Sequence, residues 1–150
     1  MKQDSAFQSG IENAVHTCMK VTADDRVSIT TDDITQSIGN ALAEECRDLG
    51  AEVSLIFLED YGKRPLTEVP EELVKDIVEF EPNVTFFAAS GQEGEVKMRM
   101  GSTQQIHRLL KDQQKALPRR AHMIGITPRL IREGMNADYR EINALTNQVY

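Results

Sequence analysis

The 150-residue sequence contains no tryptophan and only two cysteines, and aromatic residues make up 5% of it. No apolar run approaches the roughly 20 residues that a membrane-spanning helix needs, and the polar segment 1–10 lacks the apolar core of a secretion signal. Cys18 and Cys46 form no CxxC pair, and both fall at apolar positions of helix-like segments, so we expect reduced core residues. These features predict a cytoplasmic protein without a membrane partner.

The distribution of charge narrows the choice of partner. Apolar residues make up 40% and charged residues 27%, which is typical of one globular domain spanning residues 1–150. Residues 1–95 carry 7 Lys+Arg and 20 Asp+Glu, whereas residues 96–120 carry 7 basic residues and 1 acidic residue. Because phosphate contacts need a broad positive face, we expect no nucleic-acid partner. The basic stretch is interpreted as a solvated helix, with an acidic partner as the alternative.

Hydrophobic spacing predicts an alternation of strands and helices. Short β-branched or apolar runs predict strands at 26–30, 52–57, 83–89 and 121–126, and spacing of three and four predicts helices at 7–21, 34–49, 71–81, 105–117 and 139–150, with another opening at Thr127-Pro128. Alternating strands and helices form right-handed crossovers. We therefore expect a three-layer α/β fold, with a mostly parallel sheet of about four strands and helices on both faces.

Ligands of open parallel sheets bind beyond the carboxyl ends of the strands. The residues at those ends that could form a cleft are Thr31, Asp32, Asp33, Ser90 and Thr127. No glycine-rich phosphate motif follows the first strand, and the two aspartates there would repel a phosphate. We interpret Asp32 and Asp33 as residues that stabilise a helix start. A pair of metal ligands or an acid/base pair is the alternative.

The histidines give no sign of a reaction. His16, His107 and His122 are dispersed, without HxH or HxxxH spacing, and no GxSxG motif occurs. His16 and His107 are interpreted as surface or helix-flank residues, and His122 as a strand residue without a second metal ligand nearby. A histidine paired with a distant carboxylate is the alternative. The residues alone predict no catalytic residue, no metal ligand and no cofactor in this chain.

Two regions of the sequence resemble a known family. They comprise Val21–Thr30 with Ile38–Glu44 and Leu49–Val53, and Arg120–Thr127 with Gly134–Tyr139. Together they are similar to the N-terminal domain of thermophilic-type metallo-aminopeptidases, the aminopeptidase T family. The stretch His-Met-x-Gly-Ile-Thr, followed by Asp-Tyr, is the more specific part, and the resemblance is loose between residues 58 and 118.

The resemblance implies a two-domain, homodimeric exopeptidase that removes N-terminal residues from peptides. It also implies two divalent metal ions of the Co, Zn or Mg class, bound by Glu, His and Asp of a C-terminal catalytic domain, which activate water. None of those ligands is carried over, because this sequence ends before their region. The fold family also includes an iron-dependent dioxygenase that cleaves dihydroxypyridine rings.

Three functions therefore stay open. The first is a non-catalytic N-terminal domain of an aminopeptidase T-like enzyme, whose partners are the catalytic domain or a second copy of the chain. The second is a stand-alone ligand-binding or interaction module that uses the strand-end cleft or the basic helix Gln105–Lys115. The third is a small enzyme whose site carries no recognised motif. An apolar stripe at Ile142, Leu145 and Val149 predicts self-association.

Overall fold

The protein folds around one four-stranded parallel sheet. The computed structural model describes residues 5–123 and 125–134. The strands are β1 (Arg26–Thr31), β2 (Glu52–Phe57), β3 (Val84–Phe87) and β4 (Arg119–His122), in the order β2-β1-β3-β4. Every adjacent pair is parallel, so the carboxyl ends of all four strands lie at one edge.

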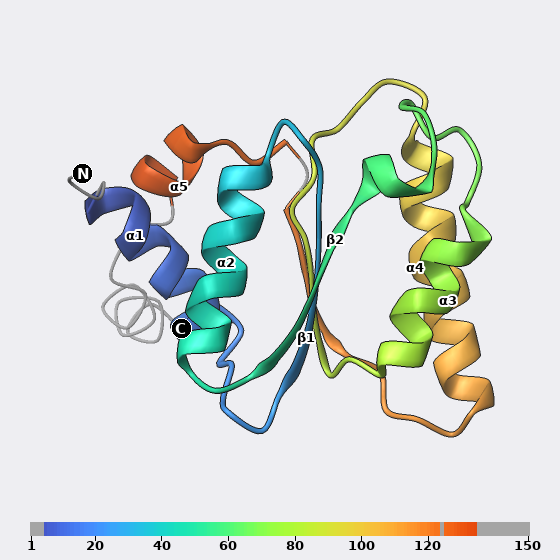
Figure 1. Cartoon of the computed structure of the whole chain (residues 1–150), viewed down its shortest axis with the longest axis horizontal. Helices are drawn as coiled ribbons and strands as arrows, with labels where there is room; N and C mark the ends of the chain where they lie inside the picture. Colours follow the sequence, from blue (N-terminus) through green and yellow to red (C-terminus); the bar gives the residue numbers. More distant parts are fainter. Residues whose placement is uncertain (1–4, 124, 135–150) are drawn as a thin grey trace, which may run out of the picture.

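Helices cover both faces of the sheet (Figure 1). On one side lie α1 (Ser5–Glu12), which continues as a π-helical segment Asn13–Cys18, α2 (Gln36–Asp48) and α5 (Pro128–Gly134). On the other side lie α3 (Glu71–Phe80) and α4 (Val96–Asp112), and a 3-10 turn, Leu58–Tyr61, follows β2. The predicted three-layer α/β fold is confirmed.

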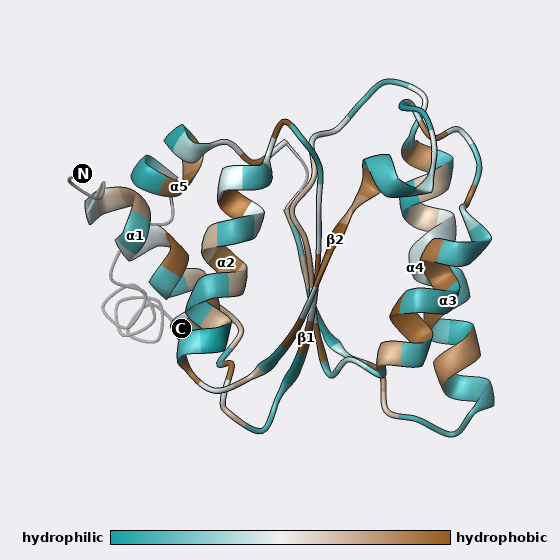
Figure 2. Cartoon of the chain, in the orientation of Figure 1, coloured by the Kyte–Doolittle hydropathy of each residue, from teal (hydrophilic) through white to brown (hydrophobic). Residues whose placement is uncertain are grey.

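Each interlayer space has its own apolar core. Side chains from α1, α2 and α5 pack on Val27, Ile29 and Phe86 of the sheet, and the apolar stripes of the helices turn towards it (Figure 2). The second core joins α3 and α4, with Leu73 and Met98 among its most buried members. Burial of a large aliphatic or aromatic side chain contributes about 1.5–3 kcal/mol. The sheet is therefore held from both sides.

Several predicted boundaries agree with the structure. The strand predicted at 52–57 is β2, residue for residue, and α2 ends before Gly50, whose φ of 93° suits the residue after a helix. The helix predicted at Thr127-Pro128 is α5, in which the Thr127 hydroxyl accepts a hydrogen bond from the Leu130 N–H at 3.1 Å. The first helix ends earlier than predicted, because the chain turns at Lys20, where φ is 51°.

The start of α4 was predicted wrongly. The sequence left residues 90–103 without an assigned element and indicated a helix at 105–117, whereas the helix runs from Val96 to Asp112. Gly101 suggested a loop, yet it is needed inside the helix, because a Cβ there would lie 2.7 Å from Cγ2 of Val69. Leu117, predicted to point inward, follows the helix and is 52% exposed.

Two burial predictions also need correction. Cys46 is buried, as expected, but Cys18 is exposed, because it ends the π-helical segment beside the turn. The mostly apolar sequence of β2 favours burial on both faces, but the strand forms one edge of the sheet and is only partly covered. No helix among the described residues is long and apolar enough to cross a membrane. The helix predicted at 139–150 and its apolar stripe lie outside the described residues.

Candidate functional site

The carboxyl edge of the sheet holds a cluster of ion pairs, here called the carboxyl-edge network: Asp32, Glu59, Arg64, Ser90 and Glu95. The guanidinium of Arg64 donates to both oxygens of Glu95, from Nε at 2.6 Å and from Nη2 at 2.7 Å. Its Nη1 donates to Asp32 and to Glu59, at 3.0 Å in each case. The side chains of Asp32 and Glu95 are 0% exposed and that of Arg64 is 8% exposed. Arg64 therefore fills the edge where a ligand of such a fold would bind.

Asp32 is saturated with hydrogen-bond donors. It accepts from the N–H and hydroxyl of Thr35 at 2.9 and 2.8 Å, from the N–H of Ser90 at 2.8 Å, and from the Ser90 hydroxyl and Arg64. Burial alone would raise the pKa of Asp32, but the bonds from Ser90, Thr35 and Arg64 outweigh it and lower the pKa to about 2. A buried carboxylate with this pKa does not serve as a base near neutral pH.

The same balance holds at Glu95. Burial opposes its ionisation, but the bonds from Arg64 and from the Leu66 N–H, at 2.7 Å, lower its pKa. The hydrogen bonds to Glu95 in turn raise the pKa of Arg64 above its usual value, with burial opposing. Asp32, Arg64 and Glu95 are thus charged at neutral pH. The network links the ends of β1 and β3 to the loop before α3 and to the start of α4.

The five residues predicted to form a strand-end cleft have different positions. Thr31, Asp32 and Ser90 lie together, and the Thr31 hydroxyl is 2.9 Å from that of Thr35. Asp33 is exposed, and its N–H donates to Glu59 at 3.1 Å. Thr127 caps α5, and within the described ranges no hydrogen bond joins it to the other four.

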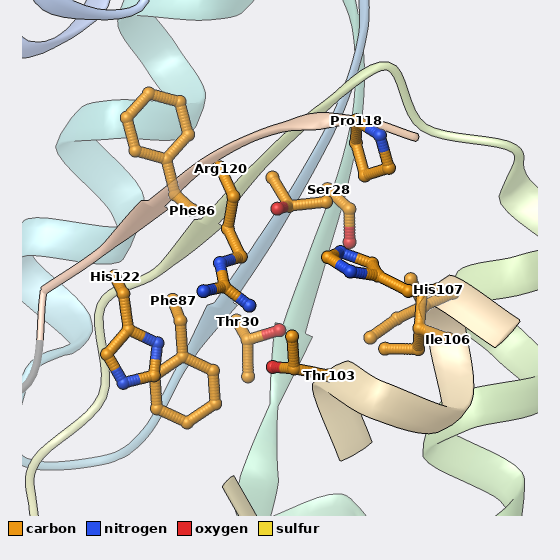
Figure 3. A pocket seen from close by; sticks show the side chains of 12 residues that line it. Ser28, Thr30, Phe86, Phe87, Thr103, Ile106, His107, Pro118, Arg120 and His122 are labelled. Carbon is orange, nitrogen blue, oxygen red and sulfur yellow. The ribbon is translucent and has the colours of Figure 1, made fainter. Parts of the chain in front are cut away.

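A second feature is an open groove between α4 and the edge strand β4, here called the α4–β4 groove. Its lining residues are Arg99, Met100, Thr103, Gln104, His107, Arg120 and His122, and its volume is ≈ 490 Å³. It adjoins a smaller cavity of ≈ 40 Å³ between α4 and the sheet, and the two share Thr103, His107, Arg120 and His122. In Figure 3 the guanidinium of Arg120 points into this space, with the rings of His107 and His122 on either side.

Strand register explains why polar groups meet below the groove. Neighbouring positions across the sheet form two rows, Ser28–Thr85–Arg120 and Thr30–Phe87–His122, which line the cavity. Alternate residues of each strand face the opposite core, as Phe86 does in Figure 3. Parallel sheets covered on both sides are normally apolar on both faces. The hydroxyl and basic side chains on this face therefore depart from the pattern of a packing surface.

The groove carries positive charge. Desolvation lowers the pKa of His122, and the charges of Arg120 and Arg99 lower it further. Desolvation also lowers the pKa of His107, followed by the charge of Arg120. Both rings are therefore mainly neutral at pH 7 beside two permanent cations. The His122 ring stacks on Phe87, with centroids 5.2 Å apart, which fixes its orientation over the cavity.

Sequence reasoning interpreted His107 and His122 separately and did not bring them together with Arg99 and Arg120. A signal was present in the spacing. Arg99, Thr103 and His107 recur every four residues, which places them on one face of a helix, and Arg120 and His122 alternate along a strand. The first pattern becomes visible only if the helix begins at Val96.

Comparisons with known proteins add little to this geometry. No family model matches the chain, and no curated protein matches it. Among solved structures, the chain is similar to wild-type AmpT from Thermus thermophilus, an aminopeptidase T, with 10% sequence identity and a TM-score of 0.49. The match covers 87% of this chain and 41% of that chain, so the chain spans about two fifths of the length of AmpT. A likeness of this size carries no statement about activity.

Proposed function

We propose that this chain is a non-catalytic N-terminal domain of an aminopeptidase T-like metalloexopeptidase. The observation that carries the proposal is the occupied carboxyl edge: Arg64 fills the place where an α/β fold would hold a substrate, and its partners Asp32 and Glu95 are buried. A closed edge suits a domain that supports catalysis elsewhere. The enzyme class comes from the resemblance of Val21–Thr30 and Arg120–Thr127 to that family.

The metal ions of such an enzyme would belong to another domain. Within residues 5–123 and 125–134, no three His, Cys, Asp or Glu side chains converge as ligands. The carboxylates of the carboxyl-edge network surround Arg64, whose charge takes the place that a cation would need. The described residues do not fit a two-metal centre.

The first test reads the native coding sequence beyond Tyr150. The proposal expects the reading frame to continue for roughly 200 residues, enough for a second domain, and to supply clusters of Glu, His and Asp. A stop codon directly after Tyr150 would contradict it.

A second test uses the purified 150-residue chain. Calorimetric titration with Co²⁺, Zn²⁺ and Mg²⁺ should show no stoichiometric binding, and leucyl p-nitroanilide should not be cleaved with any of these ions present. Robust cleavage by a pure preparation would refute a non-catalytic role.

Association is part of the same proposal. The stripe Ile142, Leu145 and Val149 is expected to pack against a catalytic domain or a second copy of the chain, so the chain alone should self-associate. Sedimentation velocity over a hundredfold concentration range measures this. A strictly monomeric species at the highest concentration argues against it.

A ligand-binding module is the second candidate, and the α4–β4 groove favours it. A volume of ≈ 490 Å³ lies within the roughly 300–1,000 Å³ of small-molecule sites. One wall of the groove belongs to α4, which includes most of the basic stretch Gln105–Lys115 expected from the sequence as a possible binding element. A stop codon after Tyr150 together with ligand binding in this groove would make this candidate the better one.

A further inference from the structure

We propose that the α4–β4 groove binds a phosphate dianion, through Arg99 and Arg120 with His107 and His122 beside them. This inference goes beyond the function proposed above and does not depend on it. It concerns a different part of the molecule from the carboxyl-edge network, on a face of the sheet rather than at its edge.

The guanidinium of Arg99 is the strongest sign of a ligand. Its Nη1 is buried and has no hydrogen-bond partner among the described residues. A buried donor without a partner costs about 1–3 kcal/mol, and more when it is charged. Arg99 also lines the groove, so an anion bound there would pair with the charge of the same guanidinium.

The charges around Arg99 are all of one sign. None of the described residues that line the groove is an aspartate or glutamate, and neither Arg99 nor Arg120 forms an ion pair within those ranges. Other basic residues of the chain do form ion pairs, such as Lys97 with Glu68 at 2.8 Å. Two arginines therefore line one groove, and no carboxylate is among its described lining residues. Electrostatics therefore favours an anion there.

The number and kind of donors favour phosphate over a carboxylate. Two guanidinium groups balance two negative charges, and planar guanidinium donors suit phosphate oxygens. Neutral histidine rings each keep one N–H donor for a further oxygen. A monocarboxylate would neutralise only one arginine. The opening is too small and too local for duplex nucleic acid, which needs a broad positive surface.

The probe is inorganic phosphate, titrated into the full chain at pH 7 and low ionic strength by isothermal calorimetry. We expect one site with a dissociation constant below about 1 mM, which corresponds to −4.1 kcal/mol. Acetate should bind at least tenfold more weakly. Absence of phosphate binding at 10 mM, or equal affinity for acetate, would overturn the proposal.

A matched pair of variants locates the site. Arg120→Gln should weaken phosphate binding at least tenfold, whereas Arg108→Gln, at an exposed position of α4 outside the groove, should change it less than twofold. Equal effects would mean diffuse attraction to the basic stretch and would overturn the assignment. Arg120 is exposed, so the fold should survive, and circular dichroism checks it; Arg99→Gln is the second variant.

The pH dependence separates the groove from general attraction. Sulfate keeps both charges between pH 7 and pH 5, so its affinity reports the protein alone. The titrating groups that face the groove are His107 on α4 and His122 on β4, between Arg99 and Arg120, and both histidine pKa values are lowered. Protonation at low pH adds positive charge, so sulfate should bind more tightly at pH 5. A constant affinity would contradict the involvement of the histidines.

Glycerol 3-phosphate identifies the source of the group. Phosphate alone occupies part of the groove, so tighter binding of the ester than of inorganic phosphate would assign a phosphate monoester. The reverse order would assign the free ion. Both orders support a phosphate site, and failure of the two compounds to compete would refute a shared one.

Discussion

Replacing Arg64 with methionine removes the one cation of the carboxyl-edge network while keeping most of the side-chain volume. Glu95 would lose both donors from Arg64 and keep only backbone hydrogen bonds from Leu66 and Gln92, whereas Asp32 would keep its four bonds from Thr35 and Ser90. Breaking a buried ion pair on one side costs about 3–5 kcal/mol. We therefore expect Arg64→Met to lower the free energy of unfolding by about that amount at pH 7, mainly through Glu95.

The loss should depend on pH with a definite sign. The folded-state pKa of Glu95 is lowered, so its contribution is present above the unfolded pKa and disappears as the pH falls through the folded one. In the variant, burial without Arg64 raises the pKa of Glu95. The carboxylate is therefore protonated, and its buried charge removed, at a higher pH than in the original protein. The difference between the two proteins should therefore shrink as the pH falls from 7, by about 1.4 kcal/mol for each pH unit crossed between the folded pKa of the variant and the lower folded pKa of the original protein.

Urea unfolding followed by far-ultraviolet circular dichroism measures both quantities, and it suits a chain without tryptophan. Lys97→Met is the control: its partner Glu68 is 74% exposed, so the loss should stay below about 1 kcal/mol. A loss of that small size for Arg64→Met, or one independent of pH, would refute the reasoning. If Arg64→Met does not fold, Arg64→Lys keeps the charge without the fork and should show a smaller loss of the same sign.

The two cysteines should differ in reactivity because they differ in burial. Cys18 is exposed, whereas Cys46 is 0% exposed and burial raises its pKa to about 12. Ellman's reagent should therefore modify one thiol in the native protein and the second only in denaturant, and equal reaction rates of the two thiols would contradict this. Gly39→Ala would place a Cβ 2.6 Å from the Thr31 side chain, so thermal unfolding should show a loss of about 1–3 kcal/mol. Asn40→Ala, at an exposed site of the same helix, should be neutral or slightly stabilising.

The fold was predictable because its signals are local. The strand Glu52–Phe57 follows Gly50 and consists mainly of apolar and β-branched residues, and β1 and β3 have the same character. Because strands alternate with helices, each helix can connect two parallel strands by a right-handed crossover, which predicts a parallel sheet. What the sequence could not indicate is which strand lies at an edge. The exposure of β2 follows from the strand order alone.

The carboxyl edge was only half predictable. Asp32 and Ser90 follow β1 and β3, which pair with each other in parallel, so their approach could be expected once the two strands are neighbours. Arg64 comes from a loop 32 residues after Asp32 and 31 before Glu95, and no periodicity connects the three. A long side chain from a loop turned an expected cleft into a set of buried ion pairs, and only tertiary packing decides that outcome.

The α4–β4 groove was not predicted from the sequence because the start of α4 was placed too late, at residue 105. If the helix is assumed to begin at residue 105, Arg99 and Thr103 precede it. Their side chains then cannot be assigned to the same helix face as His107. With the helix begun at Val96, Arg99 lies two turns before His107 on the same face, above Arg120 and His122 on the strand. Gly101 caused the error, since glycine lowers helix propensity by about 1 kcal/mol. A Cβ at Gly101 would lie 2.7 Å from Cγ2 of Val69, so a larger residue there would displace the part of α4 that carries Arg99. Substituting Gly101 should therefore weaken phosphate binding as well as stability, and a stability loss without weaker binding would separate the helix from the site.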